Sequence, residues 1–297
     1  MPDIEMRLGK DMLVLSAPID AALERYGVNS EDLEFMNLVE PDSVRDIMRL
    51  ELVAGAQCLV LGTKHMTPAQ LAAHGMEDRA RELVIALFTV AAQVRPQHIL
   101  VELANCGLPL DASSKDSLTE HRAQYAQSAR YFESETFDAY YLQGFEDTVA
   151  LKCALMGIRQ ASDRPIFASV RVQDNGMLTK RGSLEEAAAI MEEYGATVAG
   201  ICSVHDIDTT VSLTKRLCEA CSLPTLVEFD VIERNKKQGR ATKENPYYCA
   251  DCMVEAATKV RSAGAQFLRA VGKASPAYTG ALVAASMGFD CIERTHE

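Results

Sequence analysis

Polar residues follow several apolar segments of the chain, at the points where buried strands are expected to end. Carboxylates at such places can act as bases or bind a cation, and an arginine or lysine can bind an anionic group. The set comprises Glu102, Gln143, Arg171, Cys202, His205, Glu228, Asp230 and Lys273. A charge in apolar surroundings is costly unless it is paired or used. The pattern therefore predicts either a polar binding pocket or a group of ion pairs that only closes one end of the fold.

Candidate roles within this set follow from side-chain chemistry. Arg171 or Lys273 is expected to bind an anionic part of a substrate. Glu228 or Glu102 is expected to bind an ammonium group or to act as a base. Glu102, Glu228 and Arg171 are accordingly the candidate catalytic residues. The candidate substrate-binding residues are Gln143, Cys202, His205, Asp230 and Lys273.

Cys202 offers two further chemistries, each with a simpler alternative. An imidazolium at His205, three residues away, can lower the pKa of the thiol, but a cysteine in a strand is more often a small buried hydrophobic residue. A metal site made of Glu102, Cys106, Cys202 and a histidine is conceivable. It requires side chains from three separate loops to converge, and the sequence alone does not show that they do.

Two Cys-x-x-Cys pairs, Cys218/Cys221 and Cys249/Cys252, have a spacing found in zinc sites. The first pair is expected near the end of one helix and the second near the start of the next. A helix of about 12 residues is roughly 18 Å long, whereas a zinc–sulfur bond is about 2.3 Å. We therefore expect buried thiols on helix faces rather than one shared zinc ion.

Eight short, continuously apolar segments must position these residues. They cover residues 12–15, 58–61, 99–103, 139–142, 165–170, 198–202, 224–229 and 266–271. Continuous rather than alternating apolar runs indicate strands that are buried on both faces of a parallel sheet. The alternation of strands with helical segments predicts an α/β fold, namely a (β/α)8 TIM barrel, with a doubly wound open sheet as the alternative.

Local signals mark the intervening helices. Residues 44–56 carry an apolar stripe of helical period, and the segments 117–120 and 183–186 have the Ser/Thr-x-x-Glu pattern of a capping box. Three Gly-Ala pairs, at Gly55, Gly195 and Gly264, are expected to end helices just before strands. The basic segment 234–245 is expected to be either a solvated loop or a lid at the carboxyl end of the barrel.

Composition excludes several classes of protein. The 297 residues are 48% hydrophobic and 24% charged, which is typical of globular proteins. The net charge of −12 argues against nucleic-acid binding. Since no apolar run approaches about 18 residues, no membrane span is expected. The acidic N-terminus does not resemble a signal peptide, and nine dispersed cysteines are typical of a reducing compartment, so we expect a cytoplasmic protein.

The chain resembles the homocysteine S-methyltransferase family, which includes betaine–homocysteine methyltransferase and the homocysteine-binding barrel of cobalamin-dependent methionine synthase. The resemblance is carried by residues 37–56, 163–170, 183–188, 192–196 and 244–267, in the family's order. It implies one barrel domain over residues 1–297. The sequence leaves open whether the chain forms a homo-oligomer.

The family's zinc motif is largely lost in this chain. Family members are expected to hold zinc with three cysteines, one after the sixth strand and an adjacent pair after the eighth, and the zinc lowers the pKa of the substrate thiol. One cysteine, Cys202, remains but is displaced by one residue, and Val271 and Gly272 replace the adjacent pair. Ser16-Ala17 and Gln143-Gly144 replace two further family motifs. We therefore expect no zinc.

Three hypotheses follow from this resemblance. The first is a zinc-independent methyltransferase that acts on a small methylated substrate other than homocysteine, with a corrinoid carried on a partner protein. Charged groups such as Glu228, Arg171 and Lys273 would then bind and activate the substrate. The second is a non-catalytic barrel that serves as a binding or regulatory subunit. The third is a zinc-dependent thiol S-methyltransferase with rearranged ligands.

Overall fold

The computed structural model describes residues 3–29, 32, 35–235 and 237–292. Eight parallel strands form one sheet in the order β1-β8-β7-β6-β5-β4-β3-β2. Their bounds are β1 Leu13–Val14, β2 Cys58–Leu61, β3 His98–Leu103, β4 Ala139–Phe145, β5 Ile166–Arg171, β6 Val198–Ser203, β7 Thr225–Val231 and β8 Ala265–Gly272. All eight predicted strands are thus confirmed, with ends that differ by a few residues.

The sheet closes into a ring between β1 and β2. A parallel bridge pairs Leu15 with Cys58, and the Ser16 amide donates to the Cys58 carbonyl over 2.9 Å. The Ser16 hydroxyl accepts from the Val60 amide over 2.9 Å, so a side chain continues the ladder where the short strand β1 ends. This closure confirms the TIM barrel and excludes the open doubly wound sheet.

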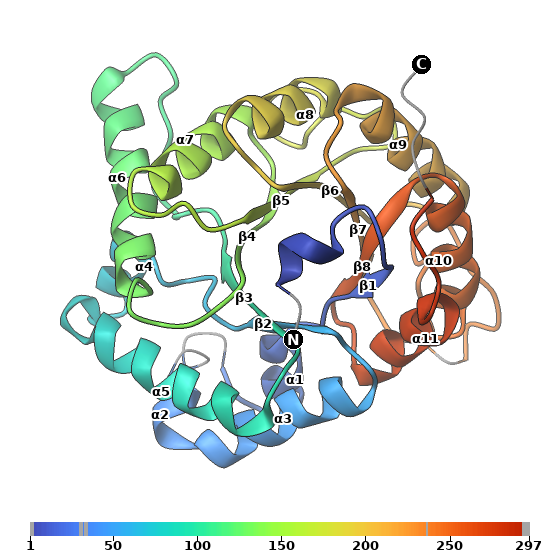
Figure 1. The fold of residues 1–297 in the computed structure, drawn as a ribbon, viewed down its shortest axis with the longest axis horizontal. Coiled ribbons are helices and arrows are strands. Elements are labelled where there is room, and N and C mark those ends of the chain that lie inside the picture. The colour runs from blue at the N-terminus through green and yellow to red at the C-terminus, as the bar shows by residue number, and fades with distance from the viewer. Residues whose placement is uncertain (1–2, 30–31, 33–34, 236, 293–297) are drawn as a thin grey trace.

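Helices surround the ring on its outside (Figure 1). Those of ten or more residues are α3 Pro41–Val53, α5 Ala80–Val94, α6 Lys115–Tyr131, α7 Thr148–Arg159, α8 Leu184–Glu193, α9 Ile207–Ala220, α10 Cys252–Ser262 and α11 Pro276–Ser286. The shorter helices α1 Ile19–Arg25, α2 Met36–Val39 and α4 Pro68–Ala73 occupy the first third of the chain. No helix within the described residues is long and apolar enough to span a bilayer.

Helix ends follow the local signals with one exception. Ser183 caps α8 by accepting from the Glu186 amide over 3.2 Å, as predicted. The start predicted at Ser117 is wrong, because α6 begins three residues earlier and Ser114 is its cap, with its hydroxyl accepting from the Ser117 amide. Gly55 has a φ of 100°, and a Cβ there would lie 2.7 Å from Val283, which explains why glycine ends α3.

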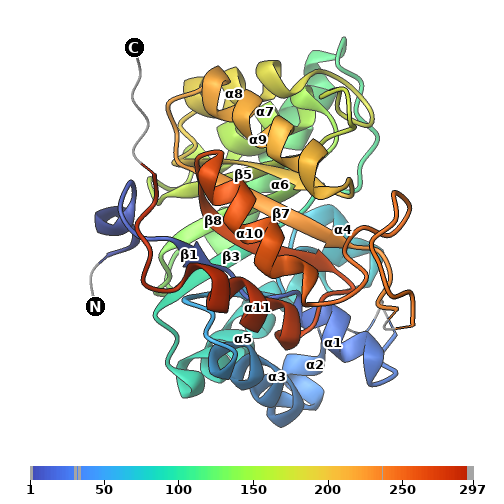
Figure 2. The same cartoon turned by 90° about the vertical axis from the view of Figure 1, so that its right-hand side faces the viewer.

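The barrel has two apolar layers, one inside the ring and one between the ring and the helices. The inner cluster includes Leu100, Tyr141, Phe167, Leu226 and Phe267. The short 3-10 helix Ile4–Arg7 packs Ile4 into this cluster and covers the amino end of the barrel, which Figure 1 shows as the dark blue segment across the ring. In Figure 2 this segment lies at one end of the barrel and the orange segment between β7 and α10 at the other.

Candidate functional site

A polar layer lies inside the ring at the carboxyl ends of the strands. Side chains alternate across a strand, so residues two positions beyond an interior apolar side chain also point into the ring. The interior residues Leu100, Tyr141, Phe167, Leu226 and Phe267 thereby predict where the polar layer begins. The residues two or four positions further along the same strands are Glu102, Gln143, Arg171, Glu228, Asp230 and Arg269. In TIM barrels this end of the ring carries the active site.

Glu228 is the centre of this layer and is fully buried. Its Oε1 accepts from the Tyr141 hydroxyl and its Oε2 accepts from Gln143 Nε2 over 2.9 Å. The thiol of Cys202, its neighbour in the sheet, lies beside Glu228. Burial, reinforced by the Glu228 charge, raises the pKa of both Tyr141 and Cys202 well above their ordinary values. Both groups therefore stay protonated at neutral pH, and the Glu228 side chain is held by two neutral donors, Tyr141 and Gln143.

Arg269 is the second centre and is only 1% exposed. Its Nε donates to the Ser16 carbonyl over 2.9 Å and its Nη2 donates to Glu102 Oε2 over 3.1 Å. The guanidinium also lies 4.9 Å from the centroid of the Tyr141 ring. Its Nη1 is buried and has no hydrogen-bond acceptor among the described residues. The cluster therefore offers one unused donor inside the barrel.

Burial and the neighbouring charges have opposite effects on the pKa values of Arg269 and Glu102. Burial alone would lower the pKa of Arg269, but the negative charges of Glu102 and Glu228, together with the Tyr141 hydroxyl, raise it above its ordinary value. For Glu102, burial raises the pKa and dominates over the opposing effect of Arg269. The guanidinium is therefore a fixed cation, and the carboxyl group depends on it to remain ionised.

Arg171 and Asp230 form an outer ion pair. Arg171 Nη1 donates to Asp230 Oδ2 over 2.6 Å, while Arg171 Nε lies 3.9 Å from Glu146 Oε1. The Arg171 side chain is 31% exposed, in contrast to the buried Arg269. It is thus the cation of the cluster that solvent or a ligand can reach most easily.

The structure brings six of the eight predicted residues into this polar layer. They are Glu102, Gln143, Arg171, Cys202, Glu228 and Asp230. His205 instead uses its Nε2 to contact the Val172 carbonyl at 3.1 Å, and Lys273 is exposed just after β8. Arg269 and Tyr141 were not predicted as site residues. The signal that could have identified Arg269 is its position two residues after Phe267, in a strand whose only other polar residue is Gln266.

The donor set of the cluster does not fit the family's zinc ion. Val271 and Gly272 offer no ligand, and burial beside Glu228 raises the pKa of the Cys202 thiol well above its ordinary value. The substitute site is not assembled either, because Cys106 packs in the outer apolar layer and Glu102 is paired with Arg269. Within the described part of the chain, no group of three or more His, Cys, Asp or Glu side chains is arranged to hold a metal ion.

The two Cys-x-x-Cys pairs lie near the helix ends where the sequence predicts, but the prediction that their thiols are buried holds only for Cys221, because Cys218, Cys249 and Cys252 are half-buried. Cys218 and Cys221 are at the end of α9, and Cys252 is the first residue of α10. The Cys218 thiol faces the Thr225 hydroxyl and the Ala263 carbonyl, and the Cys221 thiol faces the Leu217 carbonyl. These thiols therefore sit at helix ends rather than in the polar layer.

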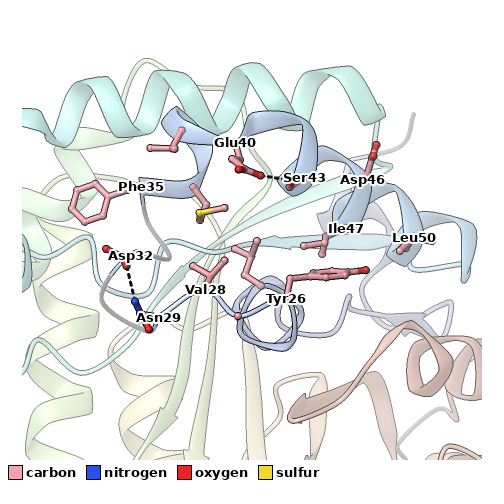
Figure 3. A pocket seen from close by; sticks show the side chains of 14 residues that line it. Tyr26, Val28, Asn29, Asp32, Phe35, Glu40, Ser43, Asp46, Ile47 and Leu50 are labelled. Atoms are coloured by element: carbon pink, nitrogen blue, oxygen red, sulfur yellow. Dashed lines mark hydrogen bonds between the residues drawn. The ribbon is translucent and has the colours of Figure 1, made fainter.

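A large cleft lies outside the ring, between α1, α2 and α3, and has a volume of about 870 Å³ (Figure 3). Apolar side chains line it, with Asp32, Glu40 and Asp46 at its edges. Asn29 donates to Asp32 over 3.2 Å and Ser43 donates to Glu40 over 3.0 Å. None of the predicted site residues lines this cleft, so its size alone does not make it the reaction site.

Comparisons with known proteins agree with the fold. The profile of the Homocysteine S-methyltransferase family matches residues 13–285. The chain is 23% identical over 301 residues to the homocysteine S-methyltransferase of Escherichia coli K12, covering 93% of this chain and 96% of that protein. It is 24% identical over 181 residues to the methionine synthase of Mycobacterium tuberculosis, but this match spans 57% of the chain and only 15% of that protein.

Solved structures give the same result. The metallated form of the Escherichia coli homocysteine methyltransferase MmuM superimposes with a TM-score of 0.76 at 16% identity, covering 93% of this chain and 96% of that one. Its oxidised form gives a TM-score of 0.76 at 17% identity, with the same coverage. At this level of identity the likeness establishes the barrel fold.

Proposed function

Because the chain belongs to the homocysteine S-methyltransferase family, we propose that it is a zinc-independent, cytoplasmic methyltransferase that acts on a small methylated substrate other than homocysteine. The observation that carries the proposal is the loss of the family's two adjacent cysteines at the end of β8. Where the family is expected to place zinc-binding cysteines, this chain has Val271 and Gly272, and two residues earlier Arg269 fills the barrel with a guanidinium. A buried cation thus lies two residues before the positions where the family is expected to place its metal ligands.

The proposed role of each residue follows from which charged side chains are paired with one another in the structure. Glu102 is neutralised by Arg269, so Glu228, held only by neutral donors, is the carboxylate available to bind an ammonium group or accept a proton. Arg171, at the outer edge of the layer, binds an anionic part of the substrate in exchange for Asp230. Gln143 fixes the orientation of the Glu228 carboxylate.

We further propose a corrinoid on a partner protein as the other methyl carrier. The support is the partial match to methionine synthases. Such a group supplies a cobalt that exchanges methyl groups. The residues of this chain bind and orient the methylated compound, exclude water from it and hold any proton at the Glu228 carboxylate.

The test is a screen of methylated amines, sulfides and ethers with added cob(I)alamin and with the purified, metal-analysed protein. We expect turnover of at least one compound without stoichiometric zinc. The Glu228→Gln variant is expected to lose about 100-fold or more of that activity. The matched control is Glu185→Gln, which changes a surface ion pair with Arg216 and should leave activity unchanged. One tightly bound zinc ion that disappears in Cys202→Ser would contradict the proposal and favour rearranged zinc ligands.

One observation favours a non-catalytic barrel as the second candidate. Glu228 and Cys202 are fully buried and Arg269 nearly so, so the polar layer closes the end of the ring in this conformation. A binding or regulatory subunit would need no more than such a closed end. This alternative is supported if no compound in the substrate screen is turned over and another protein co-purifies with the chain.

A further inference from the structure

We infer that Cys249 and Cys252 form a reversible redox pair, which closes to an intramolecular disulfide by exchange with a low-molecular-weight disulfide. Their Sγ atoms are already 3.5 Å apart. The inference does not depend on the proposed methyl transfer.

The backbone around the pair has the geometry that a disulfide requires. The Cys252 amide donates to the Cys249 carbonyl over 3.3 Å, which closes a turn of four residues. Such a turn keeps its end Cα atoms within about 7 Å, and disulfides span Cα separations of about 4.4–6.8 Å. Bond formation therefore needs only a small side-chain rotation, from the present contact to a bond of about 2.05 Å.

The thiols are also accessible. Both side chains are half-buried rather than sealed in the core, so a small oxidant can reach them. Burial and the neighbouring Cys249 thiol raise the pKa of Cys252 to about 11. Cys252 is therefore a thiol at neutral pH, and the exchange rate should rise with pH because the thiolate is the attacking form.

The pair lies at the base of the segment that joins β7 to α10. The Asn235 amide donates to the Tyr248 carbonyl over 2.9 Å, so the two sides of this segment meet next to Cys249. The preceding residue, Tyr247, is anchored in the core by a hydroxyl contact of 2.9 Å with Thr210. A disulfide would therefore tie the anchored side of the segment to the start of α10.

The thiol–disulfide exchange proceeds in two steps. The thiolate of one cysteine attacks the S–S bond of the oxidant, which forms a mixed disulfide and releases one small thiol. The second thiolate then attacks the protein sulfur of that mixed disulfide and releases the other small thiol. Two electrons pass to the oxidant, and the two protons of the cysteines end on the released thiols.

The chain contains its own control. Cys218 and Cys221 have the same spacing, but their thiols face different groups, the Ala263 carbonyl and the Leu217 carbonyl respectively. We therefore expect this second pair to remain reduced under conditions that oxidise the first.

The experiment incubates the full-length protein with graded ratios of reduced and oxidised glutathione at pH 8. It is then quenched with acid, denatured, alkylated and analysed by intact mass and peptide mapping. We expect two fewer alkyl groups than the nine cysteines allow, with one disulfide between Cys249 and Cys252. Cys249→Ser and Cys252→Ser should each prevent the disulfide and retain a glutathione adduct on the remaining cysteine. The variant with both Cys218→Ser and Cys221→Ser should oxidise like the parent.

Two results would overturn the inference. One is the recovery of nine alkylated cysteines after equilibration with oxidised glutathione alone. The other is a disulfide that maps to cysteines other than this pair, since the short Sγ separation would then not determine which thiols react.

Discussion

Replacing Arg269 by methionine should destabilise the protein strongly, because the substitution leaves a buried carboxylate without its cation. Arg269 and Glu102 have side chains that are 1% and 10% exposed and are joined over 3.1 Å. Removing one partner of such a buried pair typically costs about 3–5 kcal/mol. The Ser16 carbonyl also loses its donor in this variant. Against a typical total of about 5–15 kcal/mol, the loss is a large part of the free energy of unfolding.

A double-mutant cycle separates the electrostatic interaction between Arg269 and Glu102 from the packing that each side chain loses. Glu102→Leu alone should also destabilise, because it leaves the Arg269 charge buried without its carboxylate. The double variant Arg269→Met/Glu102→Leu removes both charges, and such apolar replacements are often close to neutral. The coupling energy should then be at least about 3 kcal/mol, because it includes the whole loss expected for Arg269→Met alone. The exposed pair Arg216–Glu185 provides the control, since Arg216→Met should change stability by about 1 kcal/mol or less.

The assay is urea unfolding at pH 7, followed by far-UV circular dichroism and by tyrosine fluorescence. Coincident transitions from the two probes would justify a two-state treatment. A loss below about 1 kcal/mol in Arg269→Met would refute the reasoning, as would a double variant whose loss equals the sum of the two single losses. Either result would mean that the pair is not electrostatically coupled in the barrel.

Two further variants test other buried carboxylates. Burial raises the pKa of Glu51 above its ordinary 4.5, so its contribution to stability is full below that pH and is lost as the pH rises through the folded-state pKa. Glu51→Gln keeps an acceptor oxygen but cannot titrate, so its stability relative to the parent should increase from pH 4.5 to pH 7.5 in urea unfolding; a constant difference would contradict the sign. Asp147 caps α7 by accepting from two backbone amides, so Asp147→Ala should cost about 0.5–2 kcal/mol, whereas Asp147→Asn should cost less.

The fold could be predicted because each of its signals is local. A continuous apolar run such as Cys58–Leu61 is sufficient to indicate a strand buried on both faces. Eight such runs, alternating with helical segments, then leave few topologies. The start of α6 was misplaced because Ser114 and Ser117 are both plausible caps, and the hydrogen bond that decides between them appears only in the structure.

The site could be predicted only in part, because its members meet through long-range contacts. Position at a strand end identified Glu228 and Gln143, which are 85 residues apart in the sequence yet hydrogen-bonded. The sequence did not show which charges neutralise one another. The pairing of Arg269 with Glu102, 167 residues away, depends on the closure of the ring. Arg269 is consequently not among the residues that the sequence predicts for the site.

Restoring the two missing cysteines should not restore a zinc site, because the backbone and the neighbours at the end of β8 have changed with them. Gly272 has a φ of 64°, and a Cβ there would collide with Asp230 Oδ1 and lie 2.7 Å from the Val231 carbonyl oxygen. A cysteine at this position is therefore strained in any rotamer. The third thiol, at Cys202, is buried beside Glu228, which raises its pKa and disfavours the thiolate that zinc requires.

We accordingly expect the Val271→Cys/Gly272→Cys variant to fold less stably and to bind no stoichiometric zinc in a titration against a chromophoric chelator. Adding Arg269→Gly to this variant removes the guanidinium as well and is the matched comparison. Tight zinc binding by the first variant would show that the thiolates alone decide the site. Zinc binding that appears only in the second would show that Arg269 is the residue that excludes the metal.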